Sequence, residues 1–463
     1  MIFNTKFFKN RYQKIHMVGI GGSGMSGIAE VLHNLGFIIT GSDLKKSDVT
    51  RRLEDLGIKI FYGHRAQNVE GAQIVVISTA IPETNPEVQA ARESGIPVIR
   101  RAEMLAELMR MKYSVAVSGS HGKTTTTSMI GTVLEKAGYD PTLIIGGRLR
   151  TLGSGAKLGQ SDFLVAEADE SDGSFLMLFP TLAVITNIDR EHLDTYGDFE
   201  NLKKAFVKFA NSVPFYGAAI VNLDDPNNQD ILPDIKKRLI TYGLKRQADI
   251  YARDVELKGT GSKFRVFKGD REIIQAELKI PGIHNVKNAL AAFAVGLEMD
   301  IDPEKIRDAL KEFPGVMRRM EFKGKVREIT FMDDYGHHPS EIDAVLETLG
   351  KFWEGRIVVI FQPHRYSRTK LLYHEFGKVF HEADLVVVTK LYPAGEKPIP
   401  GVDSSLIYEE IKKSGHRCVY LIEDRDEIKK FLKENLKPGD LVLTLGAGDV
   451  WKIGEELMAE LEQ

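Results

Sequence analysis

The sequence predicts an α/β protein with three domains, and three observations support this prediction. Short apolar runs alternate with amphipathic stretches along the whole chain, which is the pattern of parallel sheets covered by helices on both faces. Two of these runs end in a glycine-rich loop that opens a helical stretch. The chain has 463 residues, and about 150 residues per domain suggests three domains.

The composition is that of a globular protein without a strong charge. Hydrophobic residues make up 43%, charged residues make up 27%, and the formal net charge is -3, so no basic field attracts nucleic acid or a membrane. The single cysteine, Cys418, forms no internal disulfide and fits a reducing compartment. No apolar run approaches the roughly 18 residues of a membrane span, and the first residues are too polar for a signal peptide. We expect a cytoplasmic protein with neither a membrane nor a nucleic-acid partner.

The first series of apolar runs predicts a Rossmann-like N-terminal domain over residues 1–111. Its predicted strands are residues 15–20, 37–40, 74–78 and 98–99. A helical stretch over 25–35 separates the first two strands, and a charged helical stretch over 102–112 leads out of the domain. The boundary is therefore expected near residue 111.

The second and third series predict a central domain over 112–319 and a Rossmann-like α/β domain over 320–463. The strands predicted after the second glycine loop are residues 163–168, 183–187, 219–223, 329–332, 357–361, 385–389 and 441–445. Residues 249–279 instead alternate polar and apolar side chains between glycine turns, which indicates an antiparallel patch. Predicted helices over 286–297 and 303–312, followed by a linker over 313–319, complete the central domain.

The glycine loop of the central domain predicts a site for the triphosphate of ATP or GTP. Gly119 and Gly122 let backbone N–H groups turn inward, Lys123 adds a positive charge, and the next helix presents its positive N-terminus. Only two residues separate the two glycines, whereas the usual P-loop has four, so the loop is a shortened variant. The residues expected to bind the nucleotide here are Gly119, Ser120, His121, Gly122, Lys123, Thr124 and Thr125.

The first glycine loop, Gly19 to Gly24, satisfies G-x-G-x-x-G between a predicted strand and a helix, and Asp43 ends the next strand. This motif suits NAD(P), but it also suits any nucleotide diphosphate, because the glycines and the helix N-terminus recognise a pyrophosphate. An ATP loop and a third domain in the same chain favour a nucleotide-bearing substrate. An NAD(P)-dependent oxidoreductase is the alternative.

Polar side chains follow several other predicted strands, at the edge where ligands of open α/β sheets bind. Glu167 and His192 do so in the central domain, and with Thr124 they are candidate ligands of Mg²⁺, although histidine is an unusual partner for this hard cation. In the third domain, arginines and histidines at neighbouring strand ends suit a small carboxylic acid, because a guanidinium fork binds both carboxylate oxygens. An arginine in the linker, Arg319, is placed to reach a transferring phosphoryl group.

Taken together and in this order, these motifs resemble those of the ATP-dependent amide ligases of peptidoglycan assembly, and the match covers nearly the whole chain. The stretches that carry the resemblance are residues 15–27, 119–126, 167–172, 284–288, 333–339, 361–369 and 391–396. Within the family, the chain looks like the ligases that add alanine. The recycling ligases that attach a whole tripeptide read differently at the first loop, at Tyr335-Gly336 and at His364-Arg365-Tyr366.

The resemblance implies a reaction in which ATP phosphorylates the lactyl carboxylate of UDP-N-acetylmuramate and the amine of L-alanine attacks the acyl phosphate. It implies ATP and Mg²⁺ as cofactors. The sequence leaves a monomer and a homodimer open. An amide, ADP and phosphate are the products. A nucleotide-binding regulator that senses cell-wall precursors without forming a bond is a further hypothesis.

Residue roles follow from the resemblance. It implies that Lys123 stabilises the β- and γ-phosphates, that Thr124 and Glu167 hold one Mg²⁺, and that His192 helps to hold a second. The catalytic residues are then Lys123, His192 and Arg319, with Asn288 at adenine, Arg319 at a phosphate and Asp334 at the ribose. The implied UDP-sugar contacts are Gly21, Gly22, Ser23, Gly24, Asp43, His64 and Ser78, and the implied alanine contacts are Tyr335, His337, Arg365 and Arg368. Related ligases that add later amino acids use a carbamylated lysine where this chain has Phe206, which puts the ligand set of the second metal in doubt.

Overall fold

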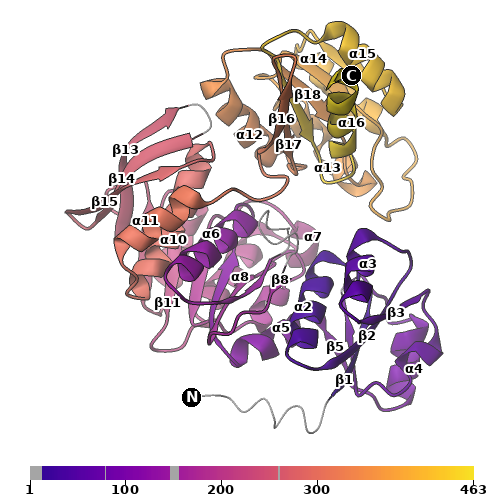
Figure 1. The fold of residues 1–463 in the computed structure, drawn as a ribbon, viewed down its shortest axis with the longest axis vertical. Helices are drawn as coiled ribbons and strands as arrows, with labels where there is room; N and C mark the ends of the chain where they lie inside the picture. Colours follow the sequence, from indigo (N-terminus) through magenta and orange to yellow (C-terminus); the bar gives the residue numbers. More distant parts are fainter. Residues whose placement is uncertain (1–12, 79, 146–155, 259–260, 463) are drawn as a thin grey trace. The chain divides into compact units, whose positions relative to one another are not determined.

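The computed structural model describes residues 13–78, 80–145, 156–258 and 261–462. These residues form three sheets with helices on their faces (Figure 1), so the predicted α/β class is confirmed. They pack into two compact units. The first unit contains the N-terminal sheet and nearly all of the central sheet, and the second contains the third sheet, from Gly315 onwards.

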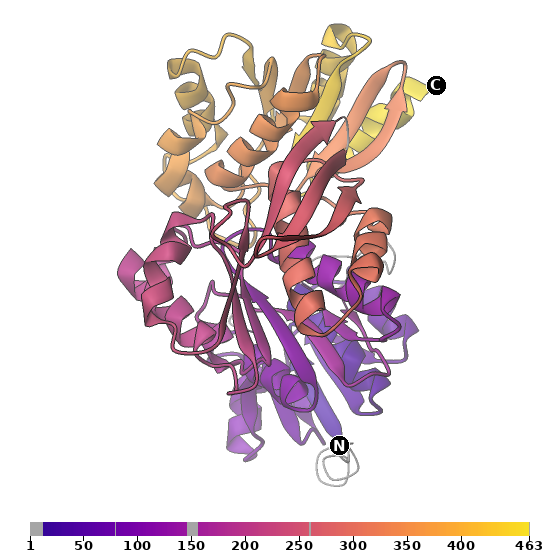
Figure 2. The same ribbon diagram turned by 90° about the vertical axis from the view of Figure 1, so that its left-hand side faces the viewer.

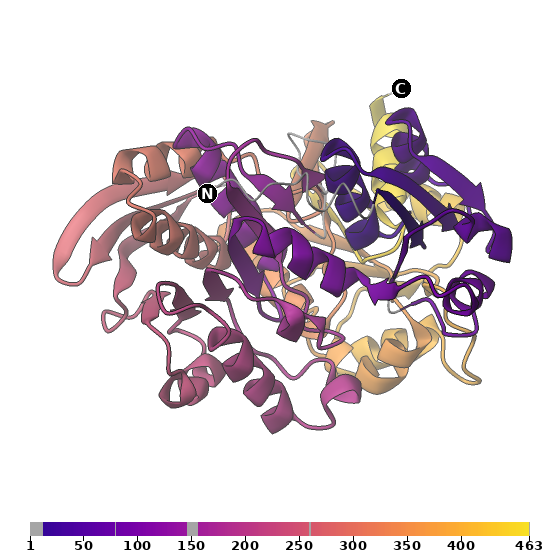
Figure 3. The same cartoon turned by 90° about the horizontal axis from the view of Figure 1, so that it is seen from below.

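The N-terminal sheet has the strand order β3-β2-β1-β4-β5, with every neighbouring pair parallel. Its strands are β1 (Lys14–Val18), β2 (Ile38–Asp43), β3 (Lys59–Tyr62), β4 (Ile74–Ile77) and β5 (Val98–Arg100). Its helices are α2 (Ser23–Asn34), α3 (Asp48–Asp55), the short η1 (Ala66–Val69) and α4 (Pro86–Glu93), seen from below in Figure 3. The order reverses between β1 and β4, and ligands of such sheets bind at that switch point. The first glycine loop leaves β1 there, so the Rossmann-like prediction is confirmed.

Helix α5 (Arg101–Arg110) leads into the central sheet, whose order is β15-β14-β13-β12-β11-β10-β6-β9-β7-β8. Its first strands are β6 (Tyr113–Ser118), β7 (Thr142–Ile144), β8 (Ala156–Lys157), β9 (Phe163–Glu167), β10 (Leu182–Ile185), β11 (Ala218–Asn222) and β12 (Leu239–Gly243). Its helices are α6 (Lys123–Lys136), η2 (Ser174–Met177), α7 (Leu193–Tyr196), α8 (Phe199–Ala210), α9 (Pro226–Ile231), η3 (Leu232–Asp234), α10 (Ile283–Glu298) and α11 (Pro303–Glu312). The middle strand β6 pairs in parallel with β9 and β10, which places the phosphate loop at the centre of one sheet edge.

The predicted antiparallel patch extends this sheet at one side. It consists of β13 (Ile250–Lys258), β14 (Gly261–Lys268) and β15 (Arg271–Leu278). Strands β14 and β15 are neighbours joined by only two residues, a connection that antiparallel strands alone can make. Helix α11 packs against both β15 and α6 (Figure 2).

The third sheet has the order β16-β17-β21-β18-β19-β20. Its strands are β16 (Glu321–Val326), β17 (Ile329–Asp334), β18 (Ile357–Phe361), β19 (Leu385–Val388), β20 (Val419–Leu421) and β21 (Leu441–Leu445). Its helices are α12 (Pro339–Phe352), α13 (Tyr366–Phe376), α14 (Ser404–Lys413), α15 (Arg425–Asn435) and α16 (Trp451–Glu462). All pairs are parallel except β16 with β17. Two apolar clusters, one on each face, hold these helices to the sheet.

Candidate active site

The phosphate loop joins the end of β6 to the start of α6. Gly119 has a backbone φ of 134°, and a Cβ atom there would lie 2.1 Å from Thr186 Oγ1. The Thr186 hydroxyl donates to the carbonyl of His121 at 2.6 Å, and the His121 N–H donates to Asn187 Oδ1 at 2.9 Å. The end of strand β10 thus holds the loop in shape. Thr124 and Thr125 follow in the first turn of α6.

Lys123 is enclosed at the base of this loop. Its ammonium donates to the carbonyl of Gly119 at 2.6 Å, to that of Ser120 at 3.2 Å and to Glu170 Oε1 at 2.8 Å. Burial opposes the charge, but the carboxylates of Glu170 and Asp169 hold the pKa of Lys123 above its ordinary value. The lysine is therefore positively charged at neutral pH and confined to one position.

An acidic run follows β9 and faces the loop. The pKa of Asp169 is lowered, because the charge of Lys123 and the Ser171 N–H outweigh burial. Glu170 is 1% exposed, and its Oε2 atom has no hydrogen-bond partner among the described residues. The Nε2 atom of His192 lies 3.9 Å from Glu170 Oε1. His192 itself has a positive φ of 56°, a conformation uncommon for residues other than glycine.

These groups fit a hard divalent cation. Carboxylate oxygens are the ligands that Mg²⁺ prefers, and Glu167 ends the strand beside the one that carries the phosphate loop. The buried Glu170 oxygen offers a further acceptor. In the part of the chain that the structure describes, no three His, Cys, Asp or Glu side chains already stand in the geometry of a metal centre. A cation here would therefore also need hydroxyl, phosphate or water ligands.

Asn288, on α10, lies against the phosphate loop. Its Oδ1 accepts from the Thr126 hydroxyl at 3.1 Å and would lie 2.9 Å from a Cβ atom on Gly122. The residue is 7% exposed, so its amide braces the loop. A contact with adenine stays a prediction.

The first glycine loop and the acidic run border one pocket of about 250 Å³. Gly22, Gly24 and Ser78 line it on the side of the N-terminal sheet. Glu167 and Asp172 line it on the side of the central sheet. Residues predicted for the UDP sugar thus share a pocket with a predicted metal ligand.

Two predicted UDP-sugar residues are used within the N-terminal sheet. Asp43 Oδ2 accepts from the Gly21 N–H at 2.9 Å, so this carboxylate shapes the glycine loop. His64 Nδ1 lies 3.1 Å from the Ser42 hydroxyl and 3.6 Å from the buried Glu87. Neither Asp43 nor His64 lines the shared pocket. The side chain of Ser23 lies outside the described part of the structure.

In the second unit, aromatic and basic side chains gather at the ends of β17 and β18. The His337 ring lies 5.3 Å from that of Tyr335 and 5.6 Å from that of His364. Arg368 Nη1 lies 3.2 Å from His364 Nδ1. Arg365 has a φ of 72°, and its N–H donates to a neighbouring loop carbonyl at 2.9 Å. The structure brings together Tyr335, His337 and Arg368 from the predicted alanine pocket, with His364 added.

Two adjacent arginines of the linker have different surroundings. Arg318 is tied down, because its Nε donates to Asp333 at 2.9 Å and its Nη1 to the Gly448 carbonyl at 3.1 Å. Arg319 lies over the Tyr335 ring at 5.4 Å and 3.5 Å from Glu341. Arg318 also lies over the Tyr335 ring, at 5.0 Å, so both arginines face the aromatic cluster.

Asp334, the predicted ribose contact, is 3% exposed and accepts from the backbone N–H groups of Met320 and Gly336, each at 2.7 Å. Burial raises its pKa to about 6, against the opposing charge of Arg319. Its carboxylate fixes the strand end, and a role at the ribose stays a prediction.

Family comparisons agree with this arrangement. Residues 14–113 match the model described as "Mur ligase family, catalytic domain", residues 117–296 match "Mur ligase middle domain", and residues 318–448 match "Mur ligase, glutamate ligase domain". A protein of Geobacter sp. (strain M21) named UDP-N-acetylmuramate–L-alanine ligase is 54% identical over 453 residues, which is 98% of either chain. The chain belongs to the Mur ligase family.

Other Mur ligase relatives support the same placement. A UDP-N-acetylmuramate–L-alanine ligase of Syntrophobacter fumaroxidans is 53% identical and covers 98% of this chain and 97% of its own. The crystal structure of UDP-N-acetylmuramate-alanine ligase from Thermotoga maritima aligns with a TM-score of 0.83 at 31% identity, covering 96% of this chain and 98% of that one. A murein peptide ligase of Psychrobacter arcticus, at 24% identity and a TM-score of 0.71, shares the fold.

Sequence reasoning missed two residues of this Mur ligase site. Glu170, the ion-pair partner of Lys123, belongs to the acidic run that was recognised, but the run gives no sign of which carboxylate meets the lysine. Arg101 lines the shared pocket, but the sequence does not distinguish it from the other charged residues of a predicted helix.

The Gly119 conformation gives a test of the phosphate loop. Gly119→Ala is expected to distort the loop and weaken ATP binding at least about tenfold, because its Cβ would overlap Thr186 and the positive φ disfavours a side chain. Gly138→Ala is the matched control, since Gly138 also has a positive φ but open space around it. Calorimetric titration with ATP measures both, and equal affinities in the two variants would contradict the role given to the loop.

His337 predicts a pH dependence in this Mur ligase. Burial first, and then the charges of Arg368 and Arg319, lower the pKa of His337 to about 4, from an ordinary value of about 6.5. Between these values the unfolded chain binds more protons than the folded chain. His337 therefore contributes stability at neutral pH, about 3 kcal/mol, that is lost as the pH falls from about 6.5 to 4. An NMR titration, assigned with His337→Gln, should place the His337 midpoint near 4; a midpoint near 6.5 would refute this.

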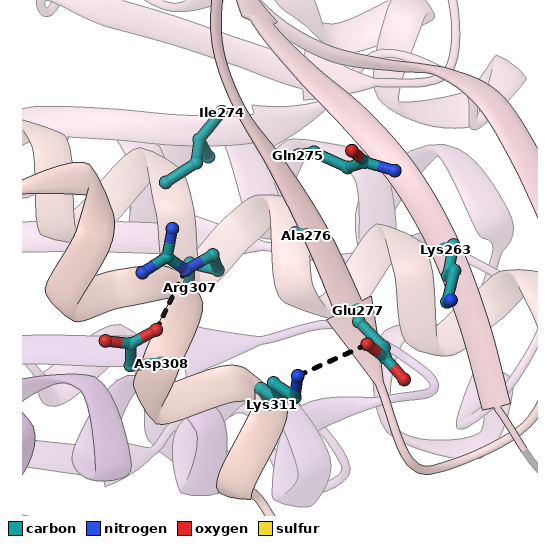
Figure 4. A pocket seen from close by; sticks show the side chains of 8 residues that line it. All are labelled: Lys263, Ile274, Gln275, Ala276, Glu277, Arg307, Asp308 and Lys311. Carbon is teal, nitrogen blue, oxygen red and sulfur yellow. Dashed lines mark hydrogen bonds and ion pairs between the residues drawn. The ribbon is translucent and has the colours of Figure 1, made fainter.

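A second pocket, of about 510 Å³, lies between β14, β15 and α11 (Figure 4). Four of its charged side chains form two ion pairs, Arg307 with Asp308 at 2.8 Å and Lys311 with Glu277 at 3.5 Å. None of the residues predicted for the site lines it.

None of the described helices combines the length and apolar character that crossing a bilayer requires.

Proposed function

We propose that the chain is an ATP-dependent ligase that joins L-alanine to the lactyl carboxylate of UDP-N-acetylmuramate in peptidoglycan synthesis. The relatives at 54% and 53% identity over nearly the whole chain carry this activity in their names. The observation on this chain that supports the proposal best is the shared pocket. The first glycine loop, which we propose to bind the diphosphate, lines this pocket together with Glu167 and Asp169, whose charges act on Lys123.

The chemistry requires activation of a carboxylate. A carboxylate is a poor acceptor for an amine, so ATP transfers a phosphoryl group to one carboxylate oxygen and phosphate becomes the leaving group. The amine of L-alanine then forms the amide bond, and ADP and phosphate leave. In such a reaction the protein supplies positioning and charge neutralisation.

Residues of this chain are assigned to those tasks. Lys123, held charged at the loop, stabilises the β- and γ-phosphates, and Arg319 neutralises the transferring phosphoryl group. Thr124, Glu167 and His192 would hold Mg²⁺, which when bound neutralises phosphate charge. Asn288 and Asp334 are assigned to the adenosine. Tyr335, His337, Arg365 and Arg368 are assigned to L-alanine.

The domain limits of 1–111, 112–319 and 320–463 belong to this proposal, with the UDP sugar, ATP and the amino acid bound in that order along the chain. The single cysteine supports a cytoplasmic location. The chain is proposed to act as a monomer or a homodimer.

One incubation tests the proposal. The purified protein receives Mg²⁺, ATP, UDP-N-acetylmuramate and either L-alanine or the tripeptide, and product mass and phosphate release are followed. An alanine adduct formed together with ADP is expected, and ATP hydrolysis should require both substrates. Preference for the tripeptide would assign the chain to recycling, and hydrolysis without an adduct would contradict ligation.

A further inference from the structure

One positively charged side chain that lines the shared pocket has no role in the reaction described above. Of the described residues that line the pocket, Arg101 is the only positively charged one. It is the first residue of α5, and it lies where the N-terminal and central sheets both contribute to the pocket wall. Glu167, Asp169 and Asp172 give that wall a strongly negative side.

The guanidinium of Arg101 lies against the first turn of α2. A Cβ atom on Gly24 would lie 3.1 Å from Arg101 Nη1 and 3.4 Å from its Cζ, so a residue larger than glycine at position 24 would displace the arginine. Among the described residues, no hydrogen bond or salt bridge of the Arg101 guanidinium is found, and its charge acts at longer range on Asp169 of the same pocket. A guanidinium carries five N–H donors, and these are available to a ligand in the pocket.

The position of Arg101 is locally unfavourable. The N-terminus of a helix carries partial positive charge and favours acidic side chains, yet α5 begins with Arg101 directly after Arg100. Arg100 is exposed to solvent, where the cost is small, whereas Arg101 is half-buried beside the pocket. A residue that breaks a local rule in a pocket wall is expected to serve binding.

We propose that Arg101 binds the diphosphate of the nucleotide sugar, which rests on the proposed function. A diphosphate held by the first glycine loop lies at the N-terminus of α2, and Arg101 lies at that same turn. The planar fork of a guanidinium matches two phosphate oxygens. The charge of Arg101 also offsets the repulsion that Glu167 and Asp169, in the wall of the same pocket, would exert on a diphosphate.

The test compares Arg101→Met with Arg100→Met, which removes the same charge from the same helix end outside the pocket. Isothermal calorimetry measures binding of UDP-N-acetylmuramate without ATP. Arg101→Met is expected to bind about 10- to 100-fold more weakly, as for a lost charge-assisted hydrogen bond, and Arg100→Met within about twofold of wild type. Arg101→Lys, which keeps the charge and loses the fork, should be intermediate.

A second ligand separates the two anionic groups of the substrate. UDP-N-acetylglucosamine has the same diphosphate and lacks the lactyl carboxylate, so Arg101→Met should weaken its binding by the same factor. Loss confined to UDP-N-acetylmuramate would move Arg101 to the carboxylate and overturn the proposal, as would unchanged binding of both ligands. ATP affinity should not change. Failure of the wild-type protein to bind any UDP sugar would instead refute the proposed function.

Discussion

Replacement of Lys123 by methionine is expected to lower kcat by at least about 100- to 1000-fold, which is the range for removal of one preorganised charge from a transition state. The reason is the position of the ammonium, which three oxygen acceptors fix at the base of the phosphate loop. Charge that develops on the transferred phosphoryl group would then meet no fixed cation at that point. Single-turnover measurements of acyl transfer, with saturating substrates, give the effect on the chemical step.

The same substitution also threatens stability, and this must be separated from catalysis. Without Lys123, Glu170 becomes a buried carboxylate without its ion-pair partner, which costs about 3–5 kcal/mol. The double variant Lys123→Met with Glu170→Gln removes both charges and is expected to recover stability while remaining inactive. Lys136→Met is the matched control, because Lys136 lies on the same helix, is exposed and pairs only at the surface with Glu312. Activity in the double variant would contradict a catalytic role for Lys123.

The parts of the fold that the sequence predicted are those with strong local signals. The three strands that carry chemistry, β1, β6 and β17, are apolar runs that end in glycine or charged residues. The edge strand β3 was missed, because its residues, Lys59–Tyr62, mix charged and apolar side chains. Strand β16 was also missed, since its turn to β17 has Arg327 and Glu328 at positive φ, a conformation that hairpin turns usually give to glycine or asparagine.

For the site, the sequence predicted which residues lie at strand ends, but it did not predict which of their side chains contact one another. Lys123 and Glu170 are 47 residues apart, and their contact at 2.8 Å depends on the pairing of β6 with β9. Asp43, an acid that follows a strand, accepts a hydrogen bond from the Gly21 N–H, a contact that the motif does not reveal, and its contact with the UDP sugar stays a prediction. Partner choice is a property of tertiary packing, which a motif does not encode.

Phe206→Ala is expected to lower the free energy of unfolding of the central domain by about 3–5 kcal/mol, the usual range for a buried phenylalanine. Phe206 is 0% exposed on α8, and its ring lies 5.2 Å from that of Phe175 at an angle of 65°. Truncation leaves a cavity beside the buried Phe175 ring. Hydrogen exchange of amides in β9 and β10 measures the local loss.

Phe215→Ala is the control for this prediction, because Phe215 lies in the same domain and is 91% exposed; its removal should change stability by no more than about 0.5 kcal/mol. Position 206 also concerns the second Mg²⁺, because the related ligases that add later amino acids carry their modified lysine there. A lysine at position 206 would have to leave its ammonium among apolar rings, which is unfavourable without a charge partner, so Phe206→Lys should destabilise the domain and gain no activity. A stable, more active Phe206→Lys enzyme would show that this position faces the metal site and that the apolar packing around Phe206 is not required.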